Sequence, residues 1–344
     1  MLKAVQSVAI SPAARWSRGV AFLILAAVVI AFAFVFPTIE DEVSRITEAA
    51  SWRSAAPNSY FWPIGNVALV LISPFSQGPL DLALLSVRLV NAALTLAALG
   101  LAIHRTGSLL ALVVLAIAAP YLAIVVATAS QQGLMIALIT LLMIARLDNR
   151  RALFAVAAAL LYLVNPATIV ILPLAMALQL RRPDGWRFLG LALLGYMLTW
   201  PFIAFAYLDS GAFLPTISGN GAYNLVLGNN PHPQAARGIA SDALLDRLLA
   251  PDAPPVSVLV GDYLKSNPGG FIANLARKAW LYWMPWDYFR SNIGAGFYAL
   301  LFVYVGIAQV AIYGAFWLLR TRINARAKWF AIALALAAWL IYTL

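Results

Sequence analysis

Three consecutive carboxylates, Glu40, Asp41 and Glu42, stand a few residues beyond the first long apolar run, at 19–36. A carboxylate this close to hydrocarbon is costly unless water solvates it or a function uses it. A positioned carboxylate can take a proton from an acceptor hydroxyl when the two lie within hydrogen-bond reach. It can also bind a cation, or stay solvated in a loop and help to stop the helix. The trio is the first candidate site, with these uses open.

The composition identifies the class of protein. The chain has 344 residues, of which 63% are hydrophobic and 10% charged, and its mean hydropathy is +0.86. Soluble domains hold roughly 45–50% apolar and about 25% charged residues. We therefore expect an all-α polytopic membrane protein. The chain has no cysteine, which excludes disulfide and thiolate chemistry, and its two histidines, His104 and His232, exclude a His-rich metal site.

The apolar runs predict about nine transmembrane helices, with the N-terminus in the cytoplasm. No small-residue cleavage pattern follows the first run, so we expect it to be retained. The two shortest runs form either a tight hairpin around Asn165-Pro166 or tilted helices in thinner membrane. The predicted spans are 19–36, 82–103, 108–127, 130–146, 152–165, 167–181, 188–207, 294–319 and 329–344.

The distribution of charge orients these spans. In this layout 14 of the 23 Lys and Arg residues lie on the cytoplasmic side, as the positive-inside rule requires. Only Asp148 and Asp184 of the 13 acidic residues lie there. The basic residues fall in short clusters between apolar runs, so the net charge of +10 does not indicate a nucleic-acid partner. The carboxylate trio is expected on the outer side of a bacterial inner membrane.

Two outer segments are too long to be turns, and they divide the chain into 1–207, 208–293 and 294–344. In the first, an apolar stretch after Gly65 is too short to span, so it lies along the interface or re-enters the membrane. The second, from Leu208, is rich in Pro, Gly, Asn and Asp and reads as loop up to Pro255. An amphipathic interfacial helix is then expected over 271–283.

Several cationic and amide side chains are further candidates, each with a simpler interpretation. Arg88, inside the second span, can pair with a first-loop carboxylate, hold a lipid phosphate, or snorkel to the interface. Arg277 and Lys278 can attract anionic headgroups in general or hold one lipid phosphate. The cluster at 221–232 offers amides for sugar hydroxyls and His232 for a phosphate, or it is an ordered loop.

In their order along the chain, these motifs resemble a family of bacterial membrane glycosyltransferases, the GT-C class with its protein mannosyltransferase and aminoarabinose transferase group. Asp41-Glu42 resembles the acidic turn after the first helix, and Phe61-Trp62-Pro63-Ile64-Gly65 resembles a PPG stretch in which Ile64 replaces a proline. Val87-Arg88-Leu89 resembles the opening of the second helix. Tyr223-Asn224-Leu225 with Gly228-Asn229-Asn230-Pro231 resembles an outer loop.

This resemblance implies a GT-C-like fold and transfer of a sugar from a polyprenyl-phosphate donor to an envelope glycan, lipid or protein acceptor. It implies inversion at the anomeric carbon, with Asp41 as the base and Glu42 beside it. Membrane lipids are the surroundings, and no cofactor or metal is expected. The expected substrate-binding residues are Glu40, Arg45, Tyr60, Arg88, Asn224, Asn229, Asn230, His232, Arg277 and Lys278.

A polytopic transporter or a lipid or glycan flippase is the alternative from another class, and a non-catalytic scaffold is a third. Transporters carry polar groups near the middle of the membrane. Arg88 is the main such group that the predicted spans contain, which argues against transport.

Overall fold

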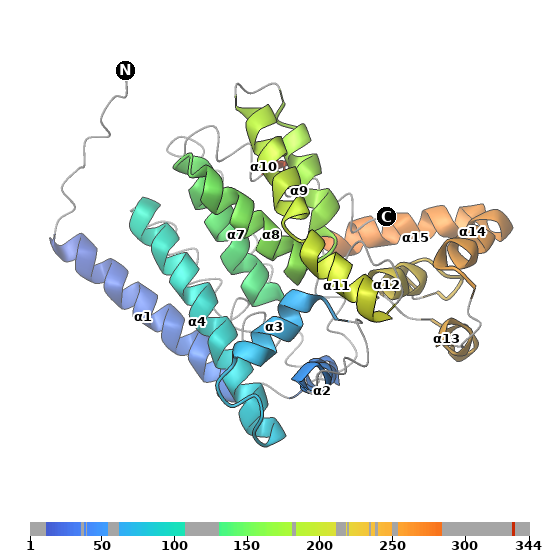
Figure 1. The fold of residues 1–344 in the computed structure, drawn as a ribbon, viewed down its shortest axis with the longest axis horizontal. Helices are drawn as coiled ribbons and strands as arrows, with labels where there is room; N and C mark the ends of the chain where they lie inside the picture. The colour runs from blue at the N-terminus through green and yellow to red at the C-terminus, as the bar shows by residue number, and fades with distance from the viewer. Residues whose placement is uncertain are drawn as a thin grey trace.

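The computed structural model describes residues 12–35, 38, 40–53, 62–106, 131–180, 184–210, 218, 220–233, 235–237, 240–249, 254–283 and 332–333. Every regular element in these ranges is helical, and none of them contains a strand (Figure 1). The all-α class is therefore confirmed for this part of the chain. Two helical stretches are long and apolar enough to cross a membrane: Leu80–His104, and Gly185–Asp209, which is interrupted at 198–199. The expected spans 108–127 and 294–319 lie outside the described residues.

Four helices form the N-terminal part. They are α1 (Pro12–Val35), α2 (Glu40–Arg53), α3 (Ile64–Ile72) and α4 (Leu80–Thr106). Helix α1 packs on α4, with Leu25 and Val29 buried against Ala92 and Leu96. Helices α2 and α3 pack on each other and on α4. The short apolar stretch after Gly65 is α3, and it is buried among α2, α4 and α8.

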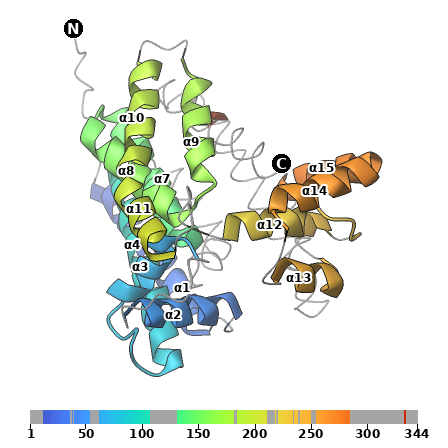
Figure 2. The same cartoon turned by 45° about the vertical axis from the view of Figure 1, so that its right-hand side comes forward.

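The largest core lies in the next five helices. They are α7 (Gln131–Leu147), α8 (Arg151–Val164), α9 (Thr168–Ala177), α10 (Gly185–Met197) and α11 (Trp200–Ser210). Helix α8 is central, because it packs on α7, α9 and α10 and also on α3 (Figure 2). Phe154 of α8 meets Phe188 of α10 edge-on, with ring centroids 4.8 Å apart.

Two turns in this region bear on the expected spans. Asn165 ends α8, and its Oδ1 accepts a hydrogen bond from the backbone N–H of Ala167, so α8 and α9 form the hairpin that was one of the two alternatives. The expected span 188–207 is divided into α10 and α11 at Leu198–Thr199. Pro201 lacks a backbone N–H and its ring disfavours a continuous helix, which accounts for the break.

The segments 37–81 and 208–293 contain more helix than the sequence indicated. The carboxylate trio belongs to the first turn of α2 and not to a loop. Negative charge is favourable there because it faces the positive end of the helix dipole. The segment that read as loop up to Pro255 contains helices as well, which corrects that expectation. The elements after residue 217 are α12 (Asn220–Gly228), the 3-10 turn η1 (Ala235–Arg237), α13 (Asp242–Leu249), α14 (Val256–Ser266) and α15 (Pro268–Trp283).

Gly65 allows α3 to approach α8 closely, and this contact can be tested. A Cβ atom at Gly65 would lie 2.9 Å from the backbone carbonyl of Leu163 and 2.6 Å from a methyl group of Val164. Gly65→Ala should therefore lower the free energy of unfolding by about 1–3 kcal/mol, as overpacking does. Gly190→Ala is the matched control, because a Cβ there meets nothing within 4 Å.

Gly190→Ala should leave stability unchanged or raise it by about 1 kcal/mol, since alanine is the better helix former. Thermal unfolding of both variants in the same detergent measures the difference. Equal stability of Gly65→Ala and the wild-type protein would contradict the packing described here.

Candidate functional site

A buried ion pair fixes the acidic turn of α2. Glu42 is completely buried, and its carboxylate accepts two hydrogen bonds from Arg88 of α4, at 2.9 Å from Nε and 2.6 Å from Nη2. The third guanidinium nitrogen, Nη1, donates to the carbonyl oxygen of Ala33 near the end of α1, at 3.4 Å. Arg88 therefore ties α1, α2 and α4 together. Of the three interpretations of Arg88, the structure shows pairing with a carboxylate of the segment 37–81.

Asp41 differs from Glu42 in its surroundings. Its side chain is 62% exposed, whereas that of Glu42 is 0% exposed. Its nearest cation is Arg45, one helical turn on, with Nη2 3.6 Å from Oδ2. Asp41 is therefore the carboxylate of this pair that a ligand can reach, and the role of Glu42 in this arrangement is to hold the turn. The side chain of Glu40 and all of Tyr60 lie outside the described residues.

Arg45 lies between Asp41 and an aromatic ring. Its side chain is 6% exposed, and its guanidinium carbon is 4.1 Å from the centroid of Trp62. Burial lowers the pKa of the Arg45 guanidinium, while the charges of Asp41 and Glu42 act in the opposite direction. A cation over an indole face gains electrostatic attraction, more so when water is excluded. Arg45 thus places positive charge next to the exposed carboxylate.

Two side chains of α2 hold Trp62 in place, and its ring is thereby positioned against the Arg45 guanidinium. Its backbone N–H faces both carboxylate oxygens of Glu48, at 3.2 and 3.3 Å. Its indole Nε1 donates to the hydroxyl oxygen of Ser44 at 3.0 Å. The stretch before α3 is therefore held on α2 by Ser44 and Glu48, which were not among the candidate residues. The two are four residues apart, so they lie on one face of a helix, and this spacing could have been recognised in the sequence.

A buried row of polar side chains continues from Arg88 into the bundle. Asn91 and Thr95 follow on the same face of α4, and each is at most 1% exposed. The Thr95 hydroxyl donates to the carbonyl oxygens of Asn91 and of Gly133 in α7, at 2.8 Å each. Arg88 is accordingly not the main polar group in the predicted spans, which corrects the argument against transport. The spacing of 88, 91 and 95 was visible in the sequence.

Asn66 and Gln131 lie beside this row and join α3 to α7. The Nδ2 of Asn66 donates to Oε1 of Gln131 at 2.8 Å. Asn66 is 2% exposed, and its Oδ1 has no hydrogen-bond partner in the described part of the chain. Buried polar atoms usually have a partner or a water.

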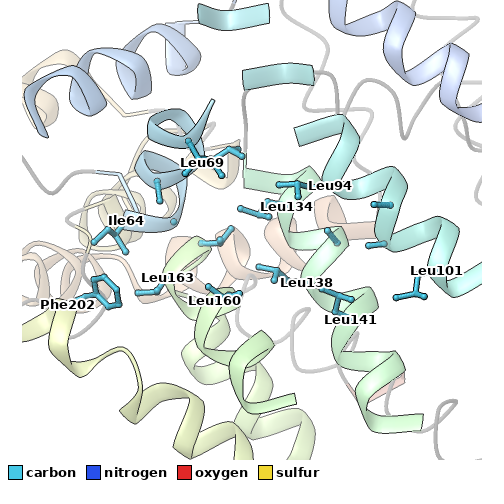
Figure 3. Close-up of a pocket in the computed structure, with 17 residues that line it drawn as sticks. Ile64, Leu69, Leu94, Leu101, Leu134, Leu138, Leu141, Leu160, Leu163 and Phe202 are labelled. Carbon is cyan, nitrogen blue, oxygen red and sulfur yellow. The ribbon is translucent and has the colours of Figure 1, made fainter. Parts of the chain in front are cut away.

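An apolar cavity of about 620 Å³ opens between α3, α4, α7, α8 and α11. Figure 3 shows leucine side chains of α4, α7 and α8 around it, with Ile64 at one end beside Phe202. Every lining residue is apolar. Small-molecule sites commonly measure ~300–1,000 Å³. The cavity is suited to a hydrocarbon chain.

The second group of expected residues gathers between α12 and α15. Lys278 Nζ donates to Oδ1 of Asn229 at 2.8 Å, and Arg277 Nη1 donates to the carbonyl oxygen of Pro233 at 3.1 Å. Asn274, which sequence reasoning missed, donates to the carbonyl oxygen of Gly228 at 2.6 Å. Three donors on one face of α15 therefore bind the end of α12 and the segment that follows it.

Asn230 and His232 complete this turn. Asn230 is 2% exposed, and its Nδ2 donates to the carbonyl oxygens of Val226 and Leu227 at the end of α12. Such carbonyls lack partners within a helix, so the amide acts as a cap. Its Oδ1 accepts from the backbone N–H of His232 at 2.8 Å.

Asn224 lies exposed on α12. In neither Figure 1 nor Figure 2 does α15 lie beside α2.

Burial lowers the pKa of Lys278 from its ordinary 10.5 to about 8. Folding then favours the neutral amine, so this lysine should make the protein more stable as pH rises from about 8 to 10.5. We expect an amine-acylating reagent to label Lys278 with a half-maximal rate near pH 8, measured by peptide mass spectrometry. The exposed Lys265 of α14 serves as an internal reference for reagent decay. A midpoint near 10.5 for Lys278 would contradict the burial effect.

The described residues contain no cluster of three or more His, Cys, Asp or Glu side chains that could hold a metal ion. No protein-family model, curated protein or solved structure shows a significant match to the chain.

Proposed function

We propose that this protein transfers a sugar from a polyprenyl-phosphate donor to an envelope acceptor at the outer face of a bacterial inner membrane. The observation that carries the proposal is the exposed carboxylate of Asp41, which a buried Glu42–Arg88 pair holds beside the cation of Arg45. The proposal also rests on the resemblance of the motifs to GT-C glycosyltransferases. A donor on the outer side must be carried by a lipid, because nucleotide sugars are absent there.

In the proposed reaction Asp41 takes the proton of the acceptor hydroxyl. The acceptor oxygen then bonds to the anomeric carbon as the bond from that carbon to the phosphate oxygen breaks, which inverts the configuration. Polyprenyl phosphate leaves with the electron pair and gains negative charge on its phosphate. A preorganised cation lowers the energy of that charge most effectively in a dry site.

The cations proposed to bind the phosphate are Arg88 and Lys278, then Arg277, His232 and Arg45. Two contacts in the structure change which of these residues is favoured. Arg88 is already engaged by both carboxylate oxygens of Glu42. Arg45 lies 3.6 Å from Asp41, and this proximity favours it as the cation next to the reacting atoms.

The apolar cavity supports the part of the proposal that concerns the lipid chain of the donor. It is lined by α3 and α4, the two helices on which α2 packs. A prenyl chain in this cavity would approach the acidic turn along helices that already contact it. The wholly apolar lining suits hydrocarbon and provides nothing for a solvated ion.

Blocking the cavity should weaken use of the donor. Ala97 of α4 lines the cavity and is exposed, whereas Ala93 of the same helix is exposed but does not line it. Ala97→Trp should raise the KM for the lipid donor by about tenfold or more, the loss expected when roughly two methylene contacts are removed. Ala93→Trp should behave as the wild type. Equal kinetics of the two variants would argue against the cavity as the lipid site.

The transporter or flippase remains the second candidate, because the buried polar row favours it. Asn66, Arg88, Asn91, Thr95 and Gln131 place polar side chains inside the helical bundle. Intramembrane polar residues commonly mark substrate or ion pathways.

The experiment that separates the two candidates uses the purified chain in proteoliposomes. Labelled polyprenyl-phosphate sugars are added together with envelope lipids and glycans, and both transfer to the acceptor and movement of label across the bilayer are measured. The proposal requires transfer that depends on the protein. Movement of the lipid without any transfer would overturn it and support the flippase.

A further inference from the structure

A second cavity, of about 330 Å³, lies away from the apolar one, among the helices that follow residue 217. Its floor is apolar, with Val226 of α12 and Leu259 and Tyr263 of α14 each at most 8% exposed. Tyr263 is backed by Phe271, with ring centroids 5.9 Å apart. In Figure 2, α12, α13 and α14 lie together to the right of the bundle.

The rim of this cavity is polar and carries both signs of charge. Arg247 of α13 and Asp262 of α14 both line it, and both are exposed. The salt bridges of the described residues do not include a pair between these two side chains. A guanidinium and a carboxylate thus line the same cavity, together with Ser241 and Asn267.

We infer that this cavity binds a sugar ring of a neutral, hydroxyl-rich ligand. A hydroxyl group both donates and accepts, so vicinal hydroxyls can bond to the Asp262 carboxylate and to the Arg247 guanidinium together. The apolar floor suits the C–H face of a sugar ring. A small volume with a few convergent polar groups is the usual form of a small-molecule site.

The charge pattern disfavours a simple anion, a divalent cation and a hydrocarbon chain. An anion would meet the Asp262 carboxylate, and a divalent cation would meet the Arg247 guanidinium with a single carboxylate to hold it. A hydrocarbon chain would displace water from these polar groups without replacing its hydrogen bonds, which costs free energy. The hydroxyls of a neutral glycan can bond to both charged groups.

The identity of this ligand as the acceptor rests on the proposed function. In that case the cavity holds a sugar of the acceptor glycan remote from the hydroxyl that reacts at Asp41. Binding itself does not depend on transfer, so it can be measured separately.

The test measures binding of short neutral oligosaccharides, each beside its sulfated counterpart, to the full chain in lipid nanodiscs. Glycoside detergents are avoided because they present sugars themselves. Arg247→Gln and Asp262→Asn should each weaken binding of the neutral oligosaccharide by about tenfold, the effect of losing one charge-assisted hydrogen bond. Lys265→Gln and Asp246→Asn are the matched controls, because they remove the same charges from exposed positions on α14 and α13 that do not line the cavity.

The result expected is neutral-sugar binding that the two cavity substitutions weaken and the two controls preserve, with unchanged thermal unfolding of all four variants. No binding by the folded wild type, a preference for the sulfated sugars, or equal binding by cavity and control variants would overturn the inference. If the wild-type protein bound the sugar but transferred none, the proposed function alone would be contradicted.

Discussion

Asp41→Asn should reduce sugar transfer by about 10²–10⁴-fold, the usual contribution of a general base. Asparagine keeps the size of the side chain but cannot take up the proton of the acceptor hydroxyl. Because Asp41 is exposed and only its contact with Arg45 would change, the variant should fold and should still bind the lipid donor. Transfer of labelled sugar and retention of labelled donor are measured on the same preparation.

The control for this prediction is Asp81→Asn. Asp81 lies in the first turn of α4 and is also exposed, so the same charge is removed from a comparable helix position. It should transfer at the wild-type rate. If Asp41→Asn were fully active, the assignment of the base to Asp41 would have to be abandoned.

Glu42→Gln should lower the free energy of unfolding by about 3–5 kcal/mol, because it leaves the Arg88 charge buried without its counter-charge. The pair has side chains 0% and 6% exposed, so water does little to compensate. Arg88→Met should destabilise by a similar amount for the reverse reason. Thermal unfolding in detergent measures both.

The double variant separates a lost pair from lost packing. Replacing both members of a buried ion pair with apolar residues of similar volume is often neutral or stabilising. Glu42→Leu combined with Arg88→Met should therefore recover most of the stability lost in the single variants. Additive losses in the double variant would show that the two side chains stabilise the protein independently of one another.

The sequence predicts the long apolar helices well, and most of the shorter or more polar helices poorly. Helices α1, α4, α7 and α8 begin and end within a few residues of the predicted apolar runs except at the start of α1, since apolar composition and flanking charges define them. Helices α12 and α13 have nine and eight residues. Helices this short are marginal alone and depend on tertiary packing. The glycine, proline and asparagine residues near their ends indicate turns, so the sequence pattern predicted a loop.

The candidate site, too, could be predicted only in part. Pairing of Arg88 with a carboxylate was one of three alternatives that its place within an apolar run left open. Which carboxylate of the trio would pair with it depends on how α2 is rotated against α3 and α4, and packing sets that rotation. The buried Glu42 and the exposed Asp41 could not be distinguished from their order in the chain. The contact of Lys278 with Asn229 joins positions 49 residues apart, a separation that local patterns do not encode.

The ion pair between Arg146 and Asp184 has a consequence for the order of folding. It joins the end of α7 to the start of α10 through two hydrogen bonds, at 2.5 and 2.9 Å, and Arg146 lies 4.0 Å above the ring of Phe188. Almost all of the largest core belongs to the continuous stretch 134–196. Contacts this close in sequence form rapidly, and chains fold from the N-terminal side as they are synthesised. We expect α7 to α10 to assemble as a nucleus as soon as they have been made, before synthesis of the chain is complete.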